Sequence, residues 1–232
     1  MKIRDTAFLF DLDGTLIDNV YQHVLAWKEA LDEIGISVPT WRLHRKLGMS
    51  GGLFVQALMA EIGTALTSDE IARLRESYRL IYRGYAGTVH ALPGAKELLR
   101  HMSDAEIPWA IVTSAHRSSA LSRLAMLELS AQVPVVTRDM VKHAKPDPDL
   151  FFAAAELLDV ETKDCIVVGD SIWDLIAARR AQALGIGFLS GGYGSEELIK
   201  AGAYCVFDGP ADMLSKIHEV GARAQGVRIT PG

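Results

Sequence analysis

Two carboxylates close the first apolar segment of the chain, and their spacing suits metal chemistry. Asp11 and Asp13 follow residues 6–10, an apolar run that we interpret as a strand of a parallel sheet covered on both faces. Ligands bind beyond the carboxyl ends of such strands. Because side chains alternate along an extended chain, the two carboxylates are expected to point the same way and to repel each other. A hard cation such as Mg2+ would compensate them, although aspartate and glycine also occur in ordinary turns.

Two later apolar runs also end in polar residues. Thr113 and Ser114 close residues 109–113, and hydroxyls between a strand and a helix can hold a phosphate oxygen, although they also cap helices. Asp170 follows residues 165–169, and Asp174 lies one helical turn later, on the same side. If these strands are neighbours, their polar ends share one crevice.

Lys145 is the basic residue expected beside these carboxylates. Pro146 and Pro148 stiffen the chain after it and would fix its direction. A lysine held there would offset the excess negative charge and bind a phosphoryl group. The alternative is an exposed lysine in a proline-rich turn. However, several buried carboxylates need a metal ion and also a basic side chain to balance their charge.

The predicted elements form an α/β fold, a Rossmann-like parallel sheet core with an inserted all-helical cap domain. Asp18 and Asn19 can cap the first of four helical segments, and Thr67 with Glu70 forms a capping-box pattern at the last. These helices are expected at residues 20–34, 39–47, 53–62 and 67–85. Strands expected elsewhere are residues 6–10, 109–113, 133–137, 165–169, 187–189 and 204–207, alternating with helices. We therefore assign residues 1–17 and 89–232 to the core and residues 18–88 to the cap.

Composition argues against several classes of partner. The 232 residues carry a net charge of -5, without the basic excess that nucleic acid or an anionic membrane attracts. Cys165 and Cys205 lie in apolar runs, which suits buried thiols in a reducing compartment. We see no apolar signal segment or spanning stretch. We expect a cytoplasmic monomer or homodimer that acts on a small molecule.

In chain order, Asp11-Leu12-Asp13-Gly14-Thr15, Thr113, Lys145-Pro146 and Gly169-Asp170 with Asp174 resemble the motifs of the haloacid dehalogenase superfamily, phosphatase-like branch. The resemblance covers nearly the whole chain, and the helical insert is similar to the small cap of that family. It implies Mg2+-dependent hydrolysis of a small phosphate monoester, a phosphorylated metabolite, through an aspartyl-phosphate on Asp11.

The resemblance also assigns roles to individual residues. Asp13 would be the general acid and then the base, with a pKa raised by neighbouring negative charge. Thr113 and Lys145 would disperse charge on the transferred group. The metal would be held by Asp11, the backbone carbonyl of Asp13, and Asp170, with Asp174 assisting. Expected phosphate- or substrate-binding residues are Thr15, Ser114, Ala115, His23, Arg45, Gly48 and Arg117.

Alternatives within this superfamily differ at single motifs. Dehalogenases and phosphonate hydrolases lack the second aspartate, so Asp13 argues against both. The β-phosphoglucomutase type stays open, because residues 18–23 resemble the start of its cap. However, residues 48–52 lack the arginine with which that enzyme holds a second phosphate, unless Arg45 or Lys46 replaces it. The basic cap residues Arg42, His44, Arg45 and Lys46 could bind a second anionic group or form a solvated helix face. A non-catalytic binding protein is the remote alternative, disfavoured because no catalytic residue is missing.

Overall fold

The computed structural model describes residues 6–130 and 132–224 and contains a six-stranded parallel sheet in the order β5-β4-β1-β6-β7-β8. These strands are β1 (Ala7–Phe10), β4 (Trp109–Val112), β5 (Val135–Val136), β6 (Cys165–Gly169), β7 (Leu184–Phe188) and β8 (Ala203–Phe207). Every residue of β1, β4 and β6 is buried, as expected for central strands covered on both faces. The predicted α/β fold is confirmed.

Helices cover both faces of this sheet, and alternating side chains of β1 reach both layers. Phe8 and Phe10 pack with one layer, whereas Ala7 and Leu9 pack with the other. The first layer comprises α5 (Ala95–Asp104), α6 (Arg117–Met126), α10 (Pro210–Ser215) and α11 (Ile217–Ala224). The second comprises α7 (Asp149–Leu157) and α8 (Ile172–Arg180), and α9 (Ser195–Ala201) packs near β7 and β8.

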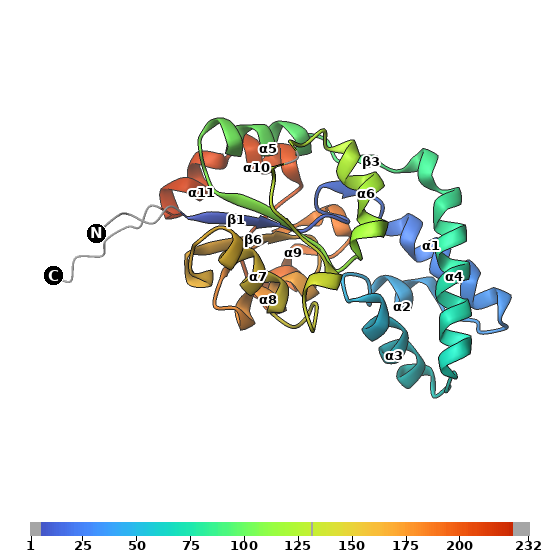
Figure 1. Cartoon of the computed structure of the whole chain (residues 1–232). Coiled ribbons are helices and arrows are strands. Elements are labelled where there is room, and N and C mark those ends of the chain that lie inside the picture. Colours follow the sequence, from blue (N-terminus) through green and yellow to red (C-terminus); the bar gives the residue numbers. More distant parts are fainter. Residues whose placement is uncertain (1–5, 131, 225–232) are drawn as a thin grey trace.

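The four helices that come first after β1 form a separate lobe, which we call the cap helices (Figure 1). They are α1 (Val20–Glu33), α2 (Thr40–His44), α3 (Gly51–Ile62) and α4 (Ser68–Gly84). Their apolar faces enclose a core of their own, which includes Trp27, Leu43 and Phe54. A two-stranded antiparallel ribbon, β2 (Ile17–Asp18) with β3 (His90–Ala91), lies where the chain enters and leaves these helices.

Most predicted elements are present, with differences at their ends. The capping box at Thr67 and Glu70 forms, with bonds in both directions. The strand expected at residues 187–189 begins at Leu184, because Gly185 and Gly187 hid its apolar pattern. The β2–β3 ribbon was not predicted, since two-residue strands carry no periodicity. In the described part of the chain, the helices are all too short or too polar to cross a membrane.

Candidate active site

Three neighbouring strands end at one edge of the sheet and deliver the polar residues that the sequence singled out. β1 lies between β4 and β6, so Asp11, Thr113 and Asp170 leave the sheet side by side. The backbone N–H of Asp11 donates to the carbonyl of Val168 at 2.9 Å, which ties the loop after β1 to β6. The shared crevice expected from the sequence therefore exists.

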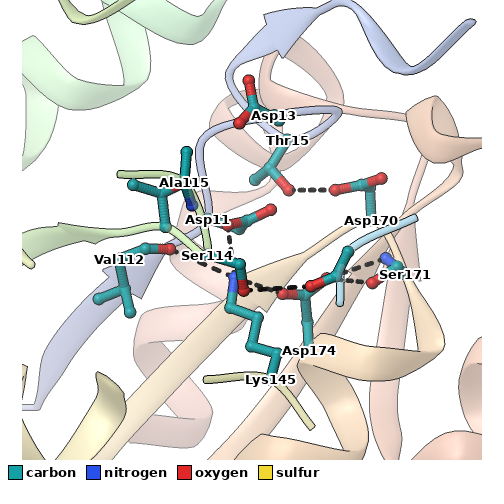
Figure 2. A network of polar contacts seen from close by, with 12 residues as sticks. Asp11, Asp13, Thr15, Val112, Ser114, Ala115, Lys145, Asp170, Ser171 and Asp174 are labelled. Atoms are coloured by element: carbon teal, nitrogen blue, oxygen red, sulfur yellow. Dashed lines mark hydrogen bonds and ion pairs between the residues drawn. The ribbon is translucent and has the colours of Figure 1, made fainter. Parts of the chain in front are cut away.

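Lys145 lies buried among three acceptors at this edge (Figure 2). Its ammonium donates to Asp11 Oδ1 and to the carbonyl of Val112 at 3.2 Å, and forms an ion pair with Asp174 Oδ1 at 2.7 Å. The single positive charge of Lys145 is therefore shared between two carboxylates. Burial alone would lower the pKa of Lys145, but Asp11 and Asp174 raise it above its usual value. The exposed-lysine alternative is excluded.

Three buried carboxylates, Asp11, Asp170 and Asp174, offer oxygens that all lie within 4.8 Å of one another. Burial, then the charge of Asp174, raises the pKa of Asp11 to about 7 although Lys145 lowers it. Burial, then Asp174 and Asp11, also raises the pKa of Asp170 well above its usual value. Lys145 supplies one positive charge against three carboxylates. This donor set therefore fits a hard divalent cation.

Asp170 and Asp174 are each held by short contacts. Thr15 Oγ1 donates to Asp170 Oδ1 at 2.8 Å, and the hydroxyl of Ser171 donates to Asp174 Oδ2 at 2.6 Å. Asp170 also lies against two backbone segments, since a Cβ on Gly14 or Gly191 would fall 2.2 or 2.1 Å from its Oδ2. Gly14 has a φ of +84°, which side chains rarely adopt. Glycines are therefore required on both sides of this carboxylate.

Asp13 does not join this group, contrary to the expectation that it points the same way as Asp11. The chain turns after β1, with the N–H of Gly14 donating to the carbonyl of Ile17, so the alternation of an extended strand is lost. Figure 2 shows Asp13 on the side of Asp11 away from Lys145. Asp13 therefore faces the cap helices and has a different set of partners.

Asp13 is surrounded by donors rather than by other carboxylates. Its Oδ1 accepts from Asn19 Nδ2 at 2.6 Å, lies 2.6 Å from Arg123 Nε and lies 3.7 Å from His23 Nε2. Burial would raise the pKa of Asp13, but Arg123, His23 and Asn19 together hold it well below its usual value. The expectation that negative neighbours raise this pKa was wrong, because the nearest charge is the buried Arg123. Asn19 likewise makes this contact instead of capping α1.

An aromatic wall from α4 supports these donors. His23 Nδ1 and the hydroxyl of Tyr78 are 2.6 Å apart, and the ring of His23 stacks on Tyr82 with centroids 4.1 Å apart. The hydroxyl of Tyr82 accepts from Asn19 at 2.9 Å, and its ring centroid lies 5.9 Å from the guanidinium carbon of Arg123. Burial lowers the pKa of His23. The helix-surface alternative for His23 is therefore excluded, and Asp13 is the point where core and cap helices meet.

A cavity of about 960 Å3 lies between the core and the cap helices. Of the predicted residues, it is lined by Asp11, Asp13, Thr113, Asp170, Ser114, Ala115, His23 and Gly48. Thr15, Lys145 and Asp174 lie behind this lining and contact it through the bonds described above. The backbone N–H of Ala115 donates to Thr113 Oγ1 at 3.1 Å.

Besides Thr15, two predicted phosphate- or substrate-binding residues, Arg45 and Arg117, are not among the described residues that line the cavity. Arg45 forms an ion pair with Glu197 on α9, because the end of α2 packs on the core there. Arg117 begins α6, where its backbone N–H donates to Asp139 at 2.8 Å. The other basic residues near α2 also have partners, although His44 lines the cavity. Arg42 and Lys46 pair with Glu61, and His44 Nε2 lies 2.7 Å from the carbonyl of Gly191.

The loop after α2 closes one side of the cavity. The carbonyl of Gly48 accepts from Ser114 Oγ at 3.1 Å, and that of Arg45 accepts from Trp173 Nε1 at 3.2 Å and Tyr193 OH at 3.1 Å. Gly48 has a φ of +94°, and a Cβ there would meet Ser171 at 2.6 Å. The cap helices therefore rest on the core in this structure.

Comparison with known proteins identifies the family. The sequence model for haloacid dehalogenase-like hydrolases matches residues 6–182. This chain belongs to that family. This haloacid dehalogenase-like hydrolase is similar to hexitol phosphatase A of Escherichia coli (strain K12). The two are 36% identical over 169 residues, which cover 73% of this chain and 76% of the relative.

A second curated relative and one solved structure are also similar to this hydrolase. A β-phosphoglucomutase of Bacillus subtilis (strain 168) is 29% identical over 189 residues, with 78% of this chain and 82% of the relative covered. The crystal structure of a hydrolase from Pseudomonas syringae is 47% identical, with a TM-score of 0.90 over 93% of this chain and 99% of that one. The family and the enzyme class thus agree with the resemblance seen in the motifs.

Proposed function

We propose that this hydrolase is a Mg2+-dependent phosphatase that cleaves small phosphate monoesters through an aspartyl-phosphate on Asp11. The observation that carries the proposal is the position of Asp11, which lines the cavity and is held from behind by Lys145. The named activity of the hexitol phosphatase relative supports the same reaction class.

Asp11 and Asp170 would hold the Mg2+ ion together with the backbone carbonyl of Asp13, and Asp174 would orient the site through Lys145 and Ser171. The excess of negative charge in this group supports this assignment. When bound, the ion would neutralise charge on the phosphoryl oxygens.

Hydrolysis of the phosphate ester would take place in two steps. In the first, a carboxylate oxygen of Asp11 forms a bond to phosphorus while the bond to the leaving oxygen breaks, and that oxygen takes a proton from Asp13. In the second, water attacks the aspartyl-phosphate and gives a proton to Asp13, which releases phosphate and restores Asp11. Arg123, Asn19 and His23 favour the ionised form of Asp13 that this second step requires, so the first step draws on the fraction of Asp13 that is protonated. Lys145 and Thr113 disperse charge on the transferred group.

The size of the cavity supports a small phosphorylated metabolite as substrate, since small-molecule pockets enclose roughly 300–1,000 Å3. Similarity to the B. subtilis enzyme keeps a sugar phosphate mutase as the alternative. Hydrolysis is favoured because the relative that is 36% identical is a named phosphatase, whereas the mutase relative is 29% identical. In addition, Arg45 and Lys46, the two residues near α2 that could replace the cap-loop arginine, are paired with Glu197 and Glu61.

Phosphate release with and without Mg2+ tests the proposal over p-nitrophenyl phosphate, hexitol phosphates, fructose 1-phosphate and β-glucose 1-phosphate. Asp11→Asn should abolish release, whereas Asp147→Asn, at an exposed ion pair with Arg180, should leave it unchanged. Conversion of β-glucose 1-phosphate to glucose 6-phosphate with little free phosphate would establish the mutase. Binding of phosphate esters without turnover of any would contradict both and indicate a binding protein.

A further inference from the structure

One wall of the cavity carries a row of arginines from the cap helices. Arg75, Arg79 and Arg83 follow one another at four-residue spacing on α4, which places them on one face of that helix, and all three line the cavity. Arg79 is paired with Glu76 at 3.1 Å, and Glu76 also lines the cavity. The row therefore brings more positive than negative charge to this wall.

Arg75 is the arginine of this row that has a buried N–H group without a hydrogen-bond acceptor in the part of the chain that the structure describes. Its Nε is buried and has no hydrogen-bond partner among the described residues. Its Nη2 lies against the first turn of α3, 3.2 Å from the place where a Cβ on Gly52 would stand. A buried guanidinium N–H without an acceptor is unfavourable, so this position favours a ligand that brings an acceptor.

The start of α3 adds a second source of positive potential beside Arg75. The first turn of α3 carries no acidic residue, and the side chain of Ser50 at its N-cap makes no capping bond within the described chain. The first backbone N–H groups of a helix lack intrahelical acceptors and attract negative charge. Met49, Ser50, Gly51 and Gly52 all line the same cavity, and space is open around Gly51.

We propose that Arg75 and the start of α3 bind a second anionic group of the substrate, a carboxylate or a second phosphate on the leaving-group part. This inference rests on the proposed phosphatase function and specifies its substrate class. The preferred substrates are then phosphate esters of anionic metabolites rather than of neutral polyols. The basic residues near α2 do not supply this site, because Arg42, Arg45 and Lys46 are paired with Glu61 and Glu197.

Matched substrates test the proposal. Gluconate 6-phosphate and glucitol 6-phosphate differ at one end by a carboxylate in place of a hydroxymethyl group, and fructose 1,6-bisphosphate with fructose 1-phosphate tests a second phosphate. We expect kcat/KM of the wild type to favour at least one anionic member by roughly ten- to hundredfold, the range of a charge-assisted hydrogen bond. The pair that shows the preference identifies the group that is bound.

Variants at Arg75 locate the effect. Arg75→Gln should remove the preference while leaving kcat/KM for the neutral ester and for p-nitrophenyl phosphate within about twofold, and Arg75→Lys should retain part of it. Arg73→Gln is the matched control, because Arg73 is exposed on the same helix and is not among the residues lining the cavity. Gly52→Asp would place a carboxylate beside Arg75, and should abolish the preference while the midpoint of thermal unfolding stays unchanged or rises.

Equal rates for the matched pairs, or a preference that survives both Arg75→Gln and Gly52→Asp, would overturn the inference and leave the phosphatase intact. Binding of each ester to the Asp11→Asn variant, followed by calorimetry, separates the two proposals. Tighter binding of the anionic esters that depends on Arg75 would support the site even if no ester were hydrolysed. Equal binding would refute it.

Discussion

Replacing Lys145 with methionine probes the charge balance on which the candidate active site depends. The substitution keeps an unbranched side chain of similar length and removes the ammonium. In the wild type that ammonium is 1% exposed and contacts two carboxylates, those of Asp11 and Asp174, which are themselves buried. Lys145→Met therefore leaves two carboxylates close together without their cation.

The cost follows from burial and from the number of bonds lost. Removing one partner of a buried ion pair typically destabilises a protein by about 3–5 kcal/mol. For metal-free protein at about pH 8 we expect a loss in this range. Near pH 4 the loss should be smaller, because protonation of Asp11, whose pKa is already raised to about 7, removes much of the repulsion.

Urea unfolding in the presence of a chelator, at both pH values, measures this difference. Lys96→Met is the matched control, since Lys96 pairs with Glu128 at the surface, and it should leave the unfolding midpoint nearly unchanged. A loss below about 1 kcal/mol for Lys145→Met at the higher pH would refute the reasoning, as would an equal loss at both pH values.

Three further predictions concern the groups around this centre. Gly191→Ala should weaken Mg2+ binding, measured by calorimetry, by more than about tenfold because its Cβ would displace Asp170; unchanged affinity would contradict this. Arg123→Met should raise the pKa of Asp13 and slow the second step, which phenyl phosphate and p-nitrophenyl phosphate share, so the aspartyl-phosphate should accumulate with both esters; no accumulation with either would contradict the role of Arg123. Because the pKa of Asp11 is raised on folding, metal-free protein should become less stable as the pH rises from about 4 to about 7. Mg2+ should therefore raise the unfolding temperature more at about pH 8 than at about pH 5. A rise that does not depend on pH would contradict the raised pKa of Asp11.

The sequence predicts the sheet and the residues at its edge because both depend on local patterns. The apolar runs before Asp11, Thr113 and Asp170 mark buried strands, and parallel strands end at the same edge. The capping box at Thr67 is equally local, since both of its bonds lie within one turn.

Features that depend on distant contacts could not be predicted. The direction of Asp13 follows from the turn at Gly14 and from Arg123, more than 100 residues further along the chain. Arg123 itself gives no local signal beyond a charged residue in a helix, and its burial depends on how α6 packs. Arg45 seemed available for substrate until the core supplied Glu197 as its partner. Basic residues in a cap sequence therefore cannot be assigned to a substrate without the packing of the lobe.

Trapping the phosphorylated enzyme tests the central claim most directly. Protein mixed rapidly with a radiolabelled phosphate ester and Mg2+, then quenched in acid, should carry label on a peptide that contains Asp11. The label should appear before phosphate accumulates, should be absent in Asp11→Asn and should persist in Asp147→Asn. Rapid phosphate release with no label on the protein, or label that survives Asp11→Asn, would contradict the proposed nucleophile.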